Sequence, residues 1–152
     1  MPNRGQSPAR AVSSFELFET TADVGVRGYG STLEEAFANA AKAMFSVMTD
    51  LPKVKPLKEV AVEVEAEDEE SLLVAWLNEL LAVSSIRRML FSDFKVAVER
   101  LDGLLRLRAT AYGEHVDPSR HELYTEVKAA TYALIKVGRV DDRYVAQLLL
   151  DI

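Results

Sequence analysis

Two stretches of the chain have the hydrophobic spacing of amphipathic helices. In the first, apolar residues recur three, four, seven, eight, eleven, twelve and fifteen positions after the first one, which is the period of one buried helix face. Ser31 with Glu34, or Thr32 with Glu35, provides capping-box spacing at its start, and residues 50–52 end it. The positions on this face are Leu33, Ala36, Phe37, Ala40, Ala41, Met44, Phe45 and Met48.

The second helical stretch follows a segment with strand-like alternation. In residues 60–65, valine alternates with alanine or glutamate, which is typical of a strand with one face in water. Asp68 then stands where its side chain can accept a hydrogen bond from a free N–H group at a helix start. The second helix is predicted to bury Leu72, Leu73, Trp76, Leu77, Leu80 and Leu81.

Three further segments alternate as strands. Residues 24–29 form a short strand in which Gly28 and Gly30 mark a close backbone approach or the strand end. Residues 94–101 and 104–112 flank an Asp-Gly pair, which predicts a hairpin because both residues tolerate the positive φ of a tight turn. Residues 113–121 are polar and are predicted to be irregular.

The last part of the chain leaves two interpretations open. Residues 125–137 and 144–152 read as two strands joined around residues 138–142, and a helix over residues 122–134 is the alternative. Two helices with mostly antiparallel strands predict an α+β fold. We expect a single domain in which both main helices cover one face of a mostly antiparallel β-sheet.

Composition narrows the possible functions. The 152 residues are 49% hydrophobic and 28% charged, as expected for one globular domain. The net charge of −6 disfavours a broad nucleic-acid-binding surface, since such a surface must neutralise phosphates. The chain has no cysteine and two histidines, so a metal site would rely mainly on oxygen ligands.

The chain shows no sign of a targeting or membrane segment. Residues 1–14 lack the apolar run of a signal peptide, and no later stretch reaches the roughly 18 apolar residues of a membrane span. We therefore expect a flexible tail over residues 1–14, a folded domain over residues 15–152, a cytoplasmic location and no membrane contact.

Motifs of nucleotide binding and nucleophilic catalysis are missing from the sequence. It contains no GxxxxGK[ST] phosphate loop and no GxSxG nucleophile motif. His115, Asp117 and His121 lie close together in the polar segment. They form either a metal or acid–base group or ordinary loop contacts. The acidic run over residues 63–70 is explained by a wet strand face and a helix N-terminus.

Two carboxylates are harder to explain. Asp23 precedes a strand and could simply make a turn. Asp151 follows three leucines and stands beside Ile152, whose α-carboxylate would add a second negative charge nearby. A hard cation such as Ca²⁺ or Mg²⁺, or the amine of Lys128, could compensate these charges.

A series of short motifs in matching order resembles the archease family over residues 15–152. Several motifs in the same order are more specific than any one of them. They are Phe15-Glu16-Leu17, Thr21-Ala22-Asp23-Val24-Gly25, Thr32-Leu33-Glu34-Glu35-Ala36-Phe37, Trp76-Leu77-Asn78-Glu79-Leu80-Leu81, Gly113-Glu114, Arg120-His121, Glu126-Val127-Lys128-Ala129, Thr131-Tyr132 and Leu150-Asp151-Ile152.

The resemblance implies an α+β protein that is not itself an enzyme. Such a protein activates an RtcB-type tRNA-splicing RNA ligase, its expected partner, by promoting guanylylation and multiple turnover of the ligase. The resemblance also implies a divalent metal ion, Ca²⁺ or alternatively Mg²⁺ or Mn²⁺, held by Asp23, Asp151 and Ile152. Lys128, with Asp23 and Asp151, is implied in ligase activation, and strong direct nucleic-acid binding is not expected.

The chain departs from the family pattern at two places. Glu19 and Thr20 stand where the family has Asp-His, and Ala133 stands where the family often has His. The three charged site residues remain, so metal binding is still expected, without the two imidazoles. Two other functions compete with ligase activation, namely a chaperone-like protein-binding module and a metal-dependent phosphoester hydrolase.

Overall fold

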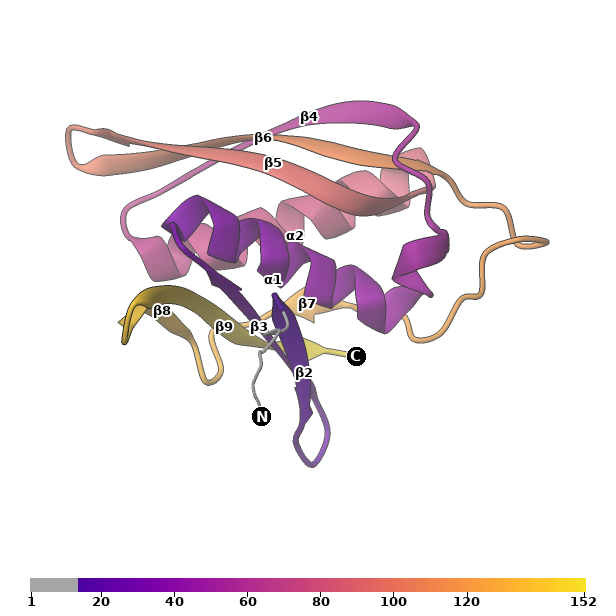
Figure 1. Cartoon of the computed structure of the whole chain (residues 1–152), viewed down its shortest axis with the longest axis horizontal. Coiled ribbons are helices and arrows are strands. Elements are labelled where there is room, and N and C mark those ends of the chain that lie inside the picture. The colour runs from indigo at the N-terminus through magenta and orange to yellow at the C-terminus, as the bar shows by residue number, and fades with distance from the viewer. Residues whose placement is uncertain (1–13) are drawn as a thin grey trace, which may run out of the picture.

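Two antiparallel sheets enclose two helices in the computed structural model, which describes residues 14–152 (Figure 1). In Figure 1 a three-stranded sheet lies above the helices and a five-stranded sheet lies below them. The tail expected over residues 1–14 lies outside the described residues except for Ser14. No helix among residues 14–152 is long and apolar enough to cross a membrane.

Each sheet combines strands from distant parts of the sequence. The five-stranded sheet has the order β2-β3-β9-β7, and β8 pairs with the same strand β9. Its strands are β2 (Phe15–Glu19), β3 (Val24–Gly30), β7 (Ala129–Ala130), β8 (Lys136–Val140) and β9 (Arg143–Asp151). The other sheet has the order β4-β6-β5, with β4 (Lys58–Ala66), β5 (Met89–Leu101) and β6 (Leu104–His115).

Helix α1 (Leu33–Met48) begins with the second of the two predicted caps. Thr32 Oγ1 accepts a hydrogen bond from Glu35 N–H at 3.1 Å, and Glu35 Oε1 accepts one from Ser31 N–H at 2.6 Å. The predicted apolar face is buried, except that Met48 is half-buried. Four residues outside that face are buried as well, because sheets cover the helix on two sides: Ala38, Asn39, Ala43 and Val47.

Helix α2 (Glu69–Arg87) confirms the predicted cap at Asp68, whose Oδ1 accepts a hydrogen bond from Ser71 N–H at 2.7 Å. Five of the six residues predicted to be buried are fully buried, and Leu81 is half-buried. Trp76 Nε1 donates to Phe37 O of α1 at 3.0 Å, which satisfies a buried donor and joins the two helices.

Between α1 and β4 the chain forms a 3₁₀ turn, η1 (Leu51–Lys53).

The α+β class is confirmed, but the arrangement of layers differs from the expected single sheet. The helices lie between two separate sheets instead of covering one face of one sheet (Figure 1). The periodicity of a helix shows which residues are apolar, and it does not count the layers that bury them.

The C-terminal third departs most from the sequence-based prediction. Residues 125–137 do not form one strand, and the alternative helix over residues 122–134 is wrong. Strand β6 also continues into the segment predicted to be irregular. The start of the predicted strand or helix, around residues 122–125, instead contacts the end of α1. Tyr124 N–H donates to Met48 O at 2.9 Å, and Thr49 Oγ1 donates to Glu122 O at 2.6 Å. Because these main-chain groups complete the helix terminus, they are not available for a helix or ladder of their own.

Candidate functional site

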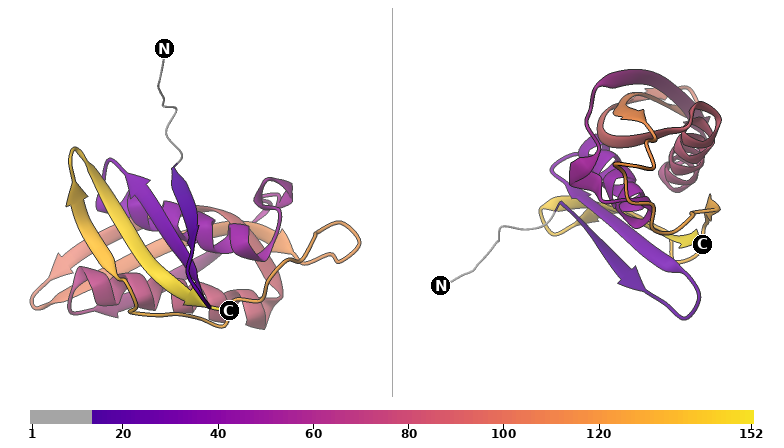
Figure 2. Two further views of the ribbon diagram at one scale, coloured as in Figure 1. Left: turned by 90° about the horizontal axis from the view of Figure 1, so that it is seen from below. Right: turned by 90° about the vertical axis from the view of Figure 1, so that its right-hand side faces the viewer.

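One end of the five-stranded sheet brings Asp23, Asp151 and Ile152 together. Strands β3 and β9 are antiparallel, with Val24 opposite Leu150, so the two aspartates come next on adjacent strands. The end of β9 lies beside the β2–β3 hairpin in both views of Figure 2. Leu150 is in the core, and since side chains alternate along a strand, the Asp151 side chain faces away from the helices.

A hairpin turn fixes the main chain of Asp23. Thr20 Oγ1 donates to Asp23 O at 3.1 Å, and Asp23 N–H donates to Thr20 Oγ1 at 3.2 Å. Thr20 is one of the residues that departs from the family pattern, and its hydroxyl closes this turn. Neither Asp23 nor Asp151 has an ion-pair partner within residues 14–152.

Lys128 is joined to this end of the sheet through its main chain. Its N–H donates to Asp151 O at 2.8 Å, next to the pairing of Ala129 with Asp151. The Lys128 side chain is exposed and forms no ion pair with the described residues. It lines a surface groove of about 490 Å³ between residues 126–128 and helix α2, which contributes Asn78 and Ser85.

The donor set at this end consists of oxygen atoms. Within residues 14–152, no three His, Cys, Asp or Glu side chains gather where they could hold a metal ion. A cation bound between Asp23 and Asp151 would therefore need main-chain oxygen, such as that of Ile152, or water. Carboxylate, carbonyl and water oxygens are ligands of Ca²⁺ and Mg²⁺, so the chemistry of the residues present fits a hard divalent ion.

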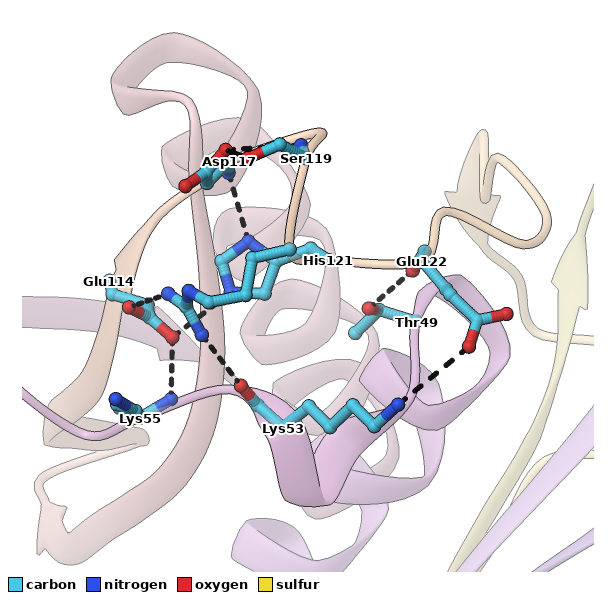
Figure 3. Close-up of polar contacts among 9 residues, drawn as sticks. Thr49, Lys53, Lys55, Glu114, Asp117, Ser119, His121 and Glu122 are labelled. Atoms are coloured by element: carbon cyan, nitrogen blue, oxygen red, sulfur yellow. Dashed lines mark hydrogen bonds and ion pairs between the residues drawn. The ribbon is translucent and has the colours of Figure 1, made fainter.

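A second polar cluster lies beyond the C-terminal end of α1, around the buried residues Glu114 and His121 (Figure 3). Asp117 N–H donates to His121 Nδ1 at 2.9 Å. That nitrogen must be unprotonated to accept, so the ring proton is on Nε2, which lies 2.9 Å from Glu114 Oε2 and donates to it. Both ring nitrogens are engaged, and the ring has no lone pair free for a metal.

Glu114 is the acceptor at the centre of this cluster. Burial raises the pKa of its carboxyl group, but the Lys55 N–H donor at 2.7 Å, His121 and the Arg120 guanidinium together lower the pKa to about 2. Arg120 also donates to Lys53 O at 3.2 Å. The network thus ties β6, the loop after it and the segment that follows α1 into one unit.

Of the two interpretations of His115, Asp117 and His121, these contacts favour ordinary loop contacts over a metal or acid–base group. Asp117 and His121 are bonded to each other, whereas His115 is exposed at the end of β6 and takes no part in the network. The sequence-based interpretation missed Glu114 as the partner of His121. The signal was present in the motifs Gly113-Glu114 and Arg120-His121, but nothing in their spacing shows that the loop folds back.

The protein is thus an α+β protein with two antiparallel sheets around two helices and an acidic, oxygen-rich sheet end. The model of the archease protein family matches residues 15–152. "Protein archease" of Pyrococcus furiosus is 50% identical over 139 residues, which cover 91% of this chain and 98% of that protein. "Protein archease" of Methanothermobacter thermautotrophicus is 43% identical over 141 residues, covering 93% and 100%. The chain therefore belongs to the archease family.

Solved structures share the fold. The solution structure of Methanobacterium thermoautotrophicum protein 1598 matches with a TM-score of 0.81 at 44% identity, covering 91% of this chain and 99% of that one. The crystal structure of "an archease, possible chaperone" from Thermotoga maritima matches with a TM-score of 0.54 and covers 89% and 94%. Its 19% identity supports a common fold and nothing finer.

Proposed function

We propose that this protein activates an RtcB-type tRNA-splicing ligase by promoting guanylylation and multiple turnover of the ligase, and is not itself an enzyme. Membership of the archease family supports the class of function. The observation that carries the proposal is the meeting of Asp23, Asp151 and the main chain of Lys128 at one sheet end. Because the partner acts in tRNA splicing, we propose a cytoplasmic location.

Asp23, Asp151 and a main-chain oxygen of Ile152 are the proposed ligands of a divalent ion, Ca²⁺ or alternatively Mg²⁺ or Mn²⁺. The two carboxylates stand on adjacent strands and have no ion-pair partner among residues 14–152, which favours this assignment because neighbouring like charges repel unless they are compensated. When bound, such an ion supplies positive charge that can orient phosphate or carboxylate oxygens. The turn held by Thr20 keeps the main chain of Asp23 in place without any imidazole.

Lys128 is proposed to act on the ligase through its exposed amine. The main chain of Lys128 is anchored to Asp151, whereas its side chain is exposed, so the amine is accessible to a partner. An ammonium group is a point charge with three donors, which suits contact with phosphate or carboxylate groups of a nucleotide-binding partner. The acidic net charge of the chain leaves most RNA contact to the ligase.

The test is ligase turnover with variants of the site residues. We expect the stimulation of guanylylation to fall by about tenfold or more in each of Asp23→Ala, Asp151→Ala and Lys128→Ala. Circular dichroism should show that each variant keeps the fold. Asp142→Ala is the matched control, because this exposed aspartate lies in the β8–β9 turn at the other end of β9. Wild-type protein that leaves guanylylation and turnover unchanged would overturn the proposal.

The same variants separate the competing functions. The relative from Thermotoga maritima is described as a possible chaperone, and a chaperone-like module should keep its stimulation after Asp23→Ala and Asp151→Ala. A metal-dependent hydrolase should instead turn over nucleotides or phosphoesters without any ligase present. Ligase activation predicts neither result.

A further inference from the structure

Residues 121–130, which we call the strap, connect the buried His121 cluster to the acidic sheet end. Apart from β7, which has two residues, the strap has no helix or strand of its own. Its first part is held by the His121–Glu114 contact and by the bond from Thr49 to Glu122. Its last part carries Lys128 and pairs with the end of β9.

Two main-chain donors, one on each side of Ala129 and Ala130, hold the strap against β9. Lys128 N–H donates to Asp151 O at 2.8 Å, and Thr131 N–H donates to Leu149 O at 3.0 Å. In an antiparallel ladder the main-chain groups of successive residues point alternately toward the partner strand and away from it. Because Thr131 donates to β9, the main-chain groups of its neighbour Ala130 face away from that strand, and among residues 14–152 no further strand pairs with β7 on that side.

Asn78 of helix α2 completes the missing pairing. Its Oδ1 accepts a hydrogen bond from Ala130 N–H at 2.9 Å, and its Nδ2 donates to Ala130 O at 3.0 Å. One side-chain amide thus supplies the donor and the acceptor that a neighbouring strand would supply. Ala130 is 5% exposed, so without Asn78 both groups would be left buried and unpaired, which disfavours the paired position of β7.

We propose that Asn78 is a positioning residue that sets the register of the strap on β9 and thereby holds Lys128 beside Asp151. The link to the ligase rests on the function proposed above, whereas the register itself is a property of this chain alone. Asn78 also borders the groove that the Lys128 side chain lines. The contact therefore couples the orientation of α2 to the site.

Two variants separate the hydrogen bonds from packing. Asn78→Asp keeps the shape and the acceptor for Ala130 N–H, loses the donor, and sets a carboxylate against Ala130 O. Asn78→Ala removes both bonds. The matched control is Asn39→Ala, which removes a buried amide of helix α1 that donates to Tyr29 O at 2.6 Å, away from the strap.

Amide hydrogen exchange measures the register directly. In both Asn78 variants we expect the amides of Lys128 and Thr131 to exchange about tenfold faster or more, relative to amides of the β4–β6 pairing. The same variants should need about tenfold more protein for half-maximal ligase stimulation. In Asn39→Ala the Lys128 and Thr131 amides should keep their wild-type exchange relative to that pairing.

Three results would overturn this assignment. The first is exchange at Lys128 and Thr131 within twofold of wild type in a folded Asn78 variant, and the second is equal acceleration in Asn39→Ala. The third is faster exchange in an Asn78 variant with unchanged stimulation while Asp151→Ala abolishes it. If wild-type protein fails to stimulate the ligase, the proposed function fails, while the exchange data still report on the register.

Discussion

At the scale of a single residue, Glu114 shows how hydrogen bonding outweighs the cost of burial. Its carboxylate is taken out of water, which favours the neutral form, yet three donors favour the charged form, one from the segment after α1 and two from the loop after β6. The pKa of Glu114 is about 2 in the folded chain, against 4.5 for the same group without these contacts. The ionised group therefore stabilises the folded state over the unfolded state.

The sign of this pKa shift predicts an acid-sensitive fold. The contribution of Glu114 is fully present above about pH 4.5 and is lost as the pH falls to about 2. Over that window the free energy of unfolding should fall by about 3 kcal/mol from this group. Glu114→Gln should remove that pH dependence and lower stability at pH 7 by about 3 kcal/mol, since it breaks a buried charge network. Denaturant unfolding between pH 2 and pH 7 measures both effects.

The control for Glu114 is an exposed carboxylate. Glu63 pairs with Arg108 at 3.2 Å, and both side chains are more than half exposed. Glu63→Gln should therefore change stability by less than about 1 kcal/mol. Equal slopes of stability against pH in wild type and Glu114→Gln would contradict the role assigned to the buried network.

At the scale of elements, the fold depends on how closely β3 approaches α1. A Cβ atom added at Gly28 would lie 2.3 Å from Ala36 O and 2.3 Å from Ala40 N, both main-chain atoms of the helix. Of the two meanings predicted for Gly28 and Gly30, close approach or strand end, Gly28 shows the first, and Gly30 shows both, because its added Cβ would lie 2.6 Å from Ala36 N and β3 ends there. Because β3 begins at the acidic site, its distance from the helix sets the position of Asp23.

Gly28→Ala should therefore destabilise the protein. The helix main chain cannot yield as a flexible side chain would, so β3 or α1 must shift, at a cost of about 1–3 kcal/mol. Gly138→Ala in β8 is the matched control, because nothing lies within 4 Å of its added Cβ, and it should change stability by less than about 0.5 kcal/mol. Thermal and denaturant unfolding of both variants measure the difference, and equal stability in the two would contradict the close packing.

At the scale of the whole molecule, the proposed cation would join the two ends of the described chain. Asp23 immediately precedes the second strand described, and Asp151 is the last residue of the last strand. An ion that binds the folded state alone stabilises it by mass action, by about 2.7 kcal/mol at a hundredfold excess over Kd. Ca²⁺ should therefore raise the unfolding temperature of wild-type protein relative to EDTA.

The same measurement on variants tests where the ion binds. Asp151→Ala should abolish the Ca²⁺-dependent rise in unfolding temperature, and Asp142→Ala should retain it. An equal Ca²⁺ effect in both variants would place the cation elsewhere in the molecule. No effect in wild type would remove the metal from the proposed function.

The sequence by itself determined the local features of this protein. The period from Leu33 to Met48, the caps at Thr32 and Asp68 and the Asp-Gly turn before β6 are all found where the sequence predicts them. Such features depend on residues within a few positions of one another, which is why a single sequence suffices. The motifs that resemble archease also identified the family, because their order along the chain is itself specific.

Only the tertiary structure decided the contacts between distant segments. It divided the strands into two sheets around the helices, set Glu114 against His121, and paired Asn78 with Ala130. It also turned residues 122–125 into the cap of α1 instead of a strand or helix. These outcomes depend on which buried main-chain groups lack partners once the chain is folded, and that is a property of the whole fold, not of a local pattern.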